Sequence, residues 1–154
     1  LGMMEKDPYV SHDEIAKKIK LSQPSVGARI RKLQEKGILS HISGVNFKKV
    51  DLHLAKIDVK ASNTTALIDE FKYCPFFVNA LVTSGKYNLC LFFTATNLKR
   101  LECIVNKHLR GNDMVKEMDM NLVITTSKDF VLPMNMEYEN QNAKLCNQEC
   151  MGEI

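Results

Sequence analysis

The sequence has no apolar run that approaches the roughly 18–20 residues needed to cross a bilayer, which excludes a transmembrane helix. The N-terminus also lacks the succession of a basic segment, an apolar core and a small-residue cleavage site that marks a secretory signal. Hydrophobic residues make up 45% of the 154 residues and charged residues 25%, as in ordinary globular proteins. We therefore expect a cytoplasmic protein of one domain or two small ones, with no membrane partner.

Catalytic motifs are missing as well. There is no Walker phosphate loop, no H-E-x-x-H zinc motif, no G-x-S-x-G nucleophile elbow and no glycine-rich dinucleotide motif after a strand. The four histidines are scattered along the chain at His12, His41, His53 and His108. We therefore expect no enzyme and no cofactor.

The five cysteines do not form the disulfide framework of a secreted domain, because a cytoplasmic chain keeps its thiols reduced. Cys90 and Cys103 lie in apolar segments and are expected to be core or near-core residues. Cys146 and Cys150 lie four residues apart in a polar tail, so they would share one face of a helix. A soft-metal site or a redox pair at these two thiols is the alternative to unpaired thiols, and unpaired thiols are preferred because two thiols make only half a zinc site.

Positive charge is concentrated in the first third of the chain. Residues 12–50 carry a net charge of +6, whereas residues 51–154 carry −2. This distribution is expected when one segment meets a polyanion and the other does not, although solvated surface lysines are the simpler alternative.

Two short helices joined by a turn are predicted in this basic segment. Ser11 and Glu14 have the S-x-x-E spacing of a capping box, which predicts a helix over residues 12–19. Ser22 is the next N-cap, and a second helix is predicted over residues 23–36, ending before Gly37. The pair is typical of a helix-turn-helix, which serves DNA binding or, less often, protein binding.

The second helix has small residues near the start of its outward face and cations further along it, the arrangement that a helix in a major groove needs. Gln23 and Ser25 are the candidates for contact with base edges. Arg31 and Lys32 are the candidates for phosphates or a guanine edge, while Arg29 lies at the rim and has an intramolecular ion pair as its alternative. The predicted DNA-binding residues are Ser22, Gln23, Ser25, Ala28, Arg29, Arg31 and Lys32.

The remainder of the chain predicts a sheet with helices. An extended linker strand is expected within residues 38–50, followed by elements over 54–61, 64–73, 77–83, 88–95, 98–109 and 118–124. Their order, strand, helix, strand, strand, helix, strand, is that of an α+β ferredoxin-like βαββαβ domain. In the second helix Leu98, Leu101, Ile104, Val105 and His108 are expected to face inward, and the last strand is expected to alternate at Met118, Met120, Leu122 and Ile124. Strand 88–95 is apolar on both faces, so the second face of the sheet is expected to be buried against another subunit.

The stretches 11–19 (SHDEIAKKI), 21–26 (LSQPSV) and 29–39 (RIRKLQEKGIL) resemble the DNA-binding head of the Lrp/AsnC transcription regulators, and the resemblance extends over roughly residues 9–131. In that family a further helix precedes the pair, so residues 1–6 are expected to hold only its end. The resemblance implies double-stranded DNA as a partner and a homodimer or higher even-numbered oligomer, in which the linker strand pairs with its copy.

The resemblance also implies a small-molecule effector. In that family a Gly-x-Tyr-Asp turn between the second and third strands of the regulatory domain helps to form a pocket between dimers. Asn88 stands here in place of the carboxylate, and a neutral amide pairs less strongly with the ammonium of an amino acid. The implied effector-binding residues are Gly85, Tyr87, Asn88, His108, Asn112 and Met114, with a plain hairpin turn as the alternative.

We therefore predict a sequence-specific transcription regulator controlled by an amino acid or a related metabolite. Its expected parts are a (winged) helix-turn-helix head over residues 1–39, a linker strand over 40–53, a ferredoxin-like dimerisation and effector domain over 54–131, and a polar tail over 132–154. Two alternatives stay open. One is a tetrapyrrole enzyme of the sirohaem decarboxylase kind, which shares the fold and would use His41, His53 or His108. The other is an architectural protein that coats DNA with little sequence preference.

Overall fold

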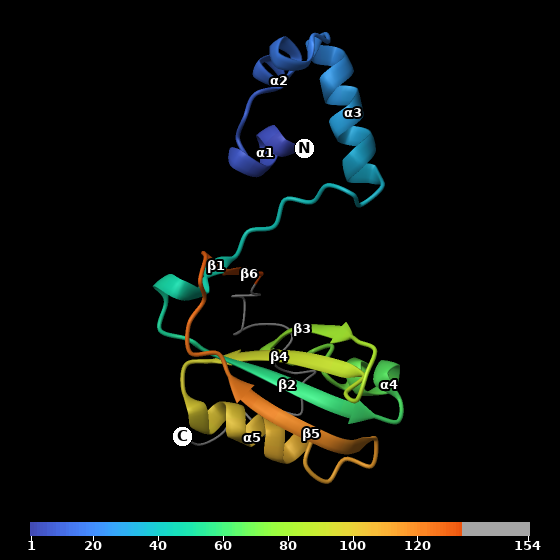
Figure 1. The fold of residues 1–154 in the computed structure, drawn as a ribbon, viewed down its shortest axis with the longest axis vertical. Helices are drawn as coiled ribbons and strands as arrows, with labels where there is room; N and C mark the ends of the chain where they lie inside the picture. Colours follow the sequence, from blue (N-terminus) through green and yellow to red (C-terminus); the bar gives the residue numbers. More distant parts are fainter. Residues whose placement is uncertain (134–154) are drawn as a thin grey trace. The chain divides into compact units, whose positions relative to one another are not determined.

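The computed structural model describes residues 1–133, which divide into two compact units (Figure 1). The first unit, Leu1–Ile42, is called the head below, and the second, which begins at Ser43, is called the regulatory unit. Among the described residues no helix is both long enough and apolar enough to cross a membrane. The predicted thiol pair, Cys146 and Cys150, lies outside the described residues.

The head consists of three helices, α1 (Gly2–Lys6), α2 (His12–Ile19) and α3 (Gln23–Glu35). The capping box is confirmed, because the amide of Glu14 donates to Ser11 Oγ at 3.2 Å and the amide of Ser11 donates to Glu14 Oε2 at 3.0 Å. These bonds satisfy amides that have no partner within the helix. The small core of the head comprises Ile15, Ala16, Val26 and Ile30.

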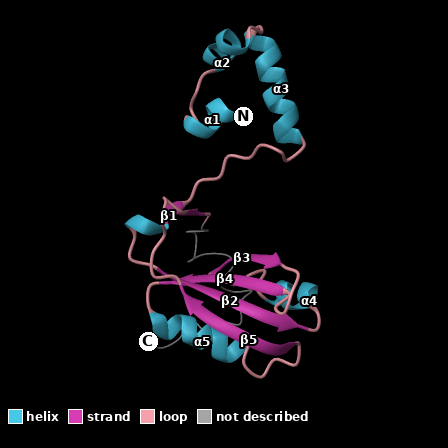
Figure 2. Cartoon of the chain, viewed as in Figure 1, coloured by secondary structure: helices cyan, strands magenta, loops and turns pink. Residues whose placement is uncertain are grey.

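The regulatory unit contains a four-stranded antiparallel sheet with two helices (Figure 2). In chain order its main elements are β2 (His53–Ala61), α4 (Thr64–Glu70), β3 (Phe77–Val82), β4 (Leu89–Ala95), α5 (Leu98–His108) and β5 (Val115–Leu122). The strands lie in the order β3-β4-β2-β5, so β2 and β4 are central and β3 and β5 are the edges. The predicted α+β fold with a ferredoxin-like regulatory domain is confirmed.

Both helices pack on the same face of this sheet. Leu67 of α4 and Ile104 of α5 are fully buried in one cluster with Ile57 of β2 and Leu91 of β4. Phe71, which follows α4, contacts the Phe93 ring edge-on, with 5.0 Å between the ring centroids. This geometry suits the quadrupoles of two aromatic rings and adds to the hydrophobic gain from their burial.

Two details of the predicted core were wrong. Leu98 is 46% exposed, because it is the first residue of α5 and the packing against the sheet starts one turn later, at Leu101. The last strand was predicted over residues 118–124, but β5 runs over Val115–Leu122, and Leu122 and Ile124 are 40% and 89% exposed. Its length is set by its partner β2, against which the pairing extends from Ala61 to Ala55.

The predicted linker strand is shorter than expected. Before β2, the linker forms a paired strand only at β1 (Val45–Asn46), and a 3-10 turn over Phe47–Lys49 follows it directly. Within the described chain β1 pairs antiparallel with β6 (Val131–Leu132). A side chain at Gly44 would place its Cβ 2.4 Å from the carbonyl oxygen of Leu132, so this close approach requires glycine. Pairing of β1 with a second copy remains a prediction.

Part of the second face of the sheet is buried without another subunit. Phe47, Leu54 and Leu132 form a separate buried cluster, against which Val78 and Phe92 pack. The segments around β1 and β6 thus cover one end of the face that was expected to need a partner. Burial of the remainder of this face by a second subunit remains a prediction.

Candidate functional site

The outward face of α3 carries the predicted DNA-binding residues, and the structure leaves it open to solvent. Gln23, Ala28, Arg31 and Lys32 are all exposed, whereas Val26, on the opposite side of the helix, is 2% exposed. Among the described residues no side-chain hydrogen bond or ion pair engages Gln23, Arg31 or Lys32. Their donors are therefore available to a partner.

The two serines at the start of α3 have a structural role. Ser22 is the N-cap, and its Oγ accepts a hydrogen bond from the amide of Ser25 at 3.4 Å. The two hydroxyls also share a hydrogen bond of 2.8 Å. Contact with DNA remains open to both serines, because a hydroxyl donates once and accepts twice, but the N-cap fixes where they point.

Arg29 is separated from the other candidates. It lines a groove with α1 residues such as Met3 and Met4 and with the apolar Ile15 and Leu33. It forms no ion pair within residues 1–133, so the predicted alternative of an intramolecular pair is not observed there.

Four residues that the sequence did not single out for DNA contact lie beside the exposed face of α3. A hollow in the head is lined by Tyr9 and His12, by Gln34 near the end of α3, and by His41 after it. Gln23 and Arg31, both predicted, line the same hollow. The sequence shows that residues 8–11 precede a helix that begins at His12, but it does not show which side of α3 these residues lie against.

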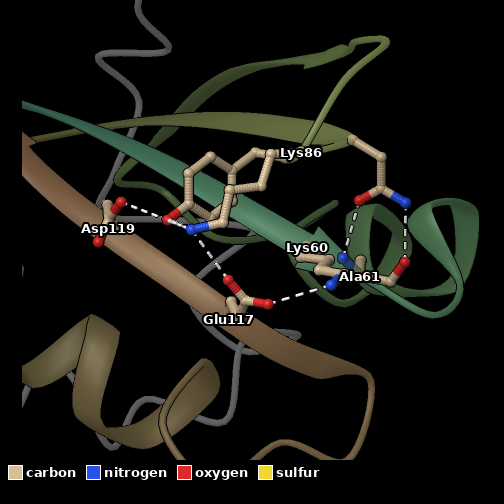
Figure 3. Close-up of polar contacts among 7 residues, drawn as sticks. Lys60, Ala61, Lys86, Glu117 and Asp119 are labelled. Carbon is tan, nitrogen blue, oxygen red and sulfur yellow. Dashed lines mark hydrogen bonds and ion pairs between the residues drawn. The ribbon is translucent and has the colours of Figure 1, made fainter.

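In the regulatory unit Asn88 is bonded to the backbone. Its Nδ2 donates to the carbonyl oxygen of Ala61 at 2.8 Å, and its Oδ1 accepts from the amide of Ala61 at 2.8 Å (Figure 3). A carboxylate has no proton to donate and could not form both bonds. The amide at residue 88 therefore joins the start of β4 to the end of β2, and its polar atoms are already occupied.

Tyr87 points to a group of charged residues on the sheet face away from the helices. Its hydroxyl donates to Asp119 of β5, and this bond raises the pKa of the tyrosine. Glu117 pairs with Lys60 at 3.0 Å and with Lys86 at 3.1 Å (Figure 3). The hydrogen bond from Lys60, followed by that from Lys86, lowers the pKa of Glu117. Asp119, Glu117 and Lys60 were not singled out from the sequence, because only the strand register shows that they lie beside the 85–88 turn.

The other predicted effector residues lie around the same end of the sheet. The amide of Ser62, next to Ala61, donates to the carbonyl oxygen of Met114 at 2.8 Å. Asn112 accepts from the amide of Met114 at 3.0 Å and donates to the carbonyl oxygen of His108 at 3.1 Å. The His108 ring lies 5.8 Å from that of Phe71. Gly85 is exposed with φ +118°, which permits the tight turn before Tyr87.

The histidines of the tetrapyrrole alternative do not converge within the regulatory unit. His53 begins β2 and pairs with Ala95, at the end of the sheet opposite to Ala61. His108 lies near the Ala61 end, through Asn112 and Met114. Within residues 1–133 no group of three or more His, Cys, Asp or Glu residues is placed to hold a metal ion.

Comparisons with known proteins agree with this architecture. Residues 1–40 match the winged helix-turn-helix DNA-binding family. An HTH-type transcriptional regulator of Pyrococcus horikoshii, PH0140, is 18% identical over 132 residues, which cover 83% of this chain and 84% of that protein.

Solved structures show the same fold. E. coli AsnC matches with a TM-score of 0.68 and 14% identity, over 83% of this chain and 89% of AsnC. The regulator NMB0573 of Neisseria meningitidis, solved in complex with L-Met, matches with a TM-score of 0.67 and 15% identity, over 88% of this chain and 92% of that one. The resemblance to the Lrp/AsnC regulators is confirmed: a helix-turn-helix head is combined here with their fold.

Proposed function

We propose that this chain, with its helix-turn-helix head and Lrp/AsnC fold, is a sequence-specific regulator of transcription that binds double-stranded DNA through α3. The observation that carries the proposal is the exposed face of α3, where Gln23, Arg31 and Lys32 have no side-chain partner within the described residues. Donors and cations left free on one helix face suit base edges and phosphates. The concentration of positive charge in residues 12–50 supports the same partner.

A salt titration of binding to duplex DNA tests this proposal. Each phosphate contact contributes about 0.9 to the slope of log affinity against log salt, so Arg31→Ala with Lys32→Ala should flatten the slope by about 2. The matched control is Lys99→Ala with Lys128→Ala, which removes the same charge from exposed positions of the regulatory unit. No binding by the parent at low salt, or an equal loss in the control, would reject α3 as the DNA-binding element.

Sequence specificity needs its own test, because an architectural protein would pass the first one. Selection from a random duplex pool should enrich a defined site, and that site should bind on the order of a thousandfold more tightly than a scrambled duplex. Equal affinity for both duplexes would favour a protein that coats DNA without sequence preference.

We further propose that an amino acid or a related metabolite binds the regulatory unit near the 85–88 turn, at an interface between copies in a dimer or a larger even-numbered oligomer. The complex of the Neisseria meningitidis relative with L-Met supports this ligand class. Because the Asn88 amide is bonded to Ala61, the partner of the ammonium group is Asp119, whose carboxylate lies beside the Tyr87 hydroxyl.

Calorimetric titration with the individual L-amino acids tests the effector proposal. At least one should bind the parent, and Asp119→Asn should weaken binding about tenfold or more, since a charge-assisted hydrogen bond is lost. The matched control is Asp113→Asn, which removes one charge from the exposed loop before β5. Equal affinity of parent and Asp119→Asn would show that the ammonium is held elsewhere, and no binding by any amino acid would reject this effector class.

A further inference from the structure

The hollow beside α3 is a second contact surface of the head. It is bounded on one side by the segment that precedes α2 and on the other by the outward face of α3, with Gln23, Ala28 and Arg31 along it. It is therefore continuous with the face proposed above to enter the major groove. A side chain in this hollow would therefore lie next to the sugar-phosphate backbone that borders the major groove.

Tyr9 is the unusual residue of this hollow. Its side chain is 93% exposed, although a tyrosine in a folded unit usually packs its ring against a neighbour. Tyr9 lies in a hydrogen-bonded turn. The amide of Tyr9 donates to Asp7 Oδ1 at 2.9 Å, and the amide of Val10 donates to the carbonyl oxygen of Asp7 at 3.2 Å.

The next residue holds this turn against the head. Val10 packs on the head core beside Ile15 and Val26, so the turn is fixed on its inner side while Tyr9 points outward. No hydrogen bond to the Tyr9 hydroxyl is formed by the residues that the structure describes. This hydrogen-bonded turn thus presents the hydroxyl and the ring of Tyr9 to solvent.

His12 reaches the same hollow from the first turn of α2. A Cβ at Gly27 would lie 3.4 Å from Nδ1 of His12, so the imidazole lies directly beside α3 at residue 27. The hollow thus offers a phenol, two imidazoles, two side-chain amides and one guanidinium, from Tyr9, His12, His41, Gln23, Gln34 and Arg31. These are the groups that proteins use to bind phosphate and sugar oxygens.

We propose that this hollow receives the sugar-phosphate backbone of DNA beside the groove that α3 enters, with the Tyr9 hydroxyl donating to a phosphate oxygen and His12 as its neighbour. The proposal rests on the DNA-binding function proposed above and extends the interface beyond α3. A partner made of phosphates fits because Arg31 lines the hollow and no carboxylate does. Such a contact orients the head on the duplex and carries no sequence preference of its own.

Because the Tyr9 side chain is uncharged, its loss can be distinguished from the loss of a cation by the salt dependence of DNA binding. A lost cation weakens binding and flattens the salt slope, whereas a lost neutral hydrogen bond weakens binding by the same factor at every salt concentration. The full chain is titrated with a mixed-sequence duplex of about 30 base pairs, since contact with the backbone does not depend on an operator. The variants are Tyr9→Phe, which removes only the hydroxyl, and Tyr9→Ala.

Both variants should bind about 2- to 10-fold more weakly than the parent with an unchanged salt slope, the effect of one hydrogen bond. The matched control, Tyr73→Phe, removes a hydroxyl from a tyrosine of the regulatory unit that is 43% exposed, and it should bind like the parent. Because the Tyr9 side chain is 93% exposed, neither substitution at residue 9 should change the melting temperature.

Unchanged affinity in Tyr9→Phe would overturn the phosphate contact, whatever Tyr9→Ala does. A loss of equal size in Tyr73→Phe would overturn it too. Failure of the parent itself to bind the duplex would instead remove the DNA-binding function on which the inference rests, so the two failures are distinguishable.

Discussion

The candidate binding residues of the two units differ in whether their side chains already have partners. In the head Gln23, Arg31 and Lys32 are exposed, and within the described residues no side-chain hydrogen bond or ion pair engages them. In the regulatory unit the corresponding candidates are engaged, since Asn88 bonds to Ala61 and Tyr87 donates to Asp119. The polar groups on the outward face of α3 are free to bind a partner, whereas those around the 85–88 turn are already bonded within the regulatory unit.

This difference bears on how each unit binds. Free donors on a rigid helix lose little on meeting DNA, because no internal bond has to break. A ligand at the 85–88 turn must replace or rearrange bonds that the unit already makes, such as that between Tyr87 and Asp119. Replacing an internal contact is one way to convert binding into a conformational change, because the ligand then favours one arrangement over another.

The largest expected effect is a loss of stability in the core of the regulatory unit, with the core of the head unchanged. Phe71 is 1% exposed and contacts the rings of Phe77, Phe93 and His108. Phe71→Ala should therefore lower the free energy of unfolding of the regulatory unit by about 3–5 kcal/mol. Hydrogen exchange followed by mass spectrometry should show protection lost in β4 and retained in α3.

The control for this prediction is Tyr73→Ala, two residues further along the chain. Because Tyr73 is 43% exposed, its removal should lower the free energy of unfolding by clearly less than Phe71→Ala does. If α3 lost protection together with β4 in Phe71→Ala, the two units would unfold as one, and the contrast between them would not extend to stability.

A smaller effect is expected at Asn88, whose side-chain amide forms two hydrogen bonds with the backbone of Ala61. Asn88→Asp keeps the shape but replaces the donor to the Ala61 carbonyl with an oxygen that repels it. The free energy of unfolding should fall by about 1–3 kcal/mol at neutral pH, as measured by urea denaturation. Asn121→Asp, the same change at an exposed position of β5, is the control and should cost less than about 0.5 kcal/mol.

The pH dependence of this variant has a defined sign. The Ala61 carbonyl should raise the pKa of Asp in the folded variant above its unfolded value of about 3.9, because only the protonated acid can donate to it. A raised pKa in the folded state means that stability is retained below the unfolded pKa and lost as the pH rises through the folded one. The deficit of Asn88→Asp should therefore shrink on acidification, and a deficit independent of pH would show that the donor to Ala61 is unimportant.

Local signals in the sequence were sufficient for much of the fold. The capping box at Ser11 and Glu14 depends on neighbours three residues apart and was predicted correctly. The alternation of Ile57 and Val59 in β2, and the hairpin between β3 and β4, depend on equally short patterns. These features are fixed by propensity and spacing, which a single sequence displays.

The features that the sequence did not reveal depend on contacts between distant segments. β5 extends from Val115 to Leu122 because β2 sets the length of the pairing, and β1 finds its partner in β6, near the end of the described chain. The Asn88 amide was noticed as a departure from a motif, but its bonds to Ala61 depend on the register of β4 against β2. Tyr9 gave no signal, because exposure beside α3 results from packing in three dimensions.

The smallest expected effect is in the head, at Gly27 of α3. Gly27 lies inside α3, where glycine is less favourable than alanine by about 0.5–1 kcal/mol. A Cβ there would lie 3.4 Å from Nδ1 of His12, an ordinary van der Waals contact. Gly27→Ala should therefore raise the free energy of unfolding of the head by about that amount, measured by hydrogen exchange at α3.

The same substitution places a methyl group in the hollow that Tyr9 and His12 line. Affinity for duplex DNA should fall, because the methyl group would occupy space that the DNA backbone is proposed to enter. Stability should rise at the same time, because alanine is more favourable than glycine inside a helix. Ala28→Gly, the opposite change at the next and exposed position, is the control and should lower stability by a similar amount. If Gly27→Ala gained stability and bound DNA as well as the parent, the glycine would have no role in binding. The head would then not give up stability for DNA binding at this position.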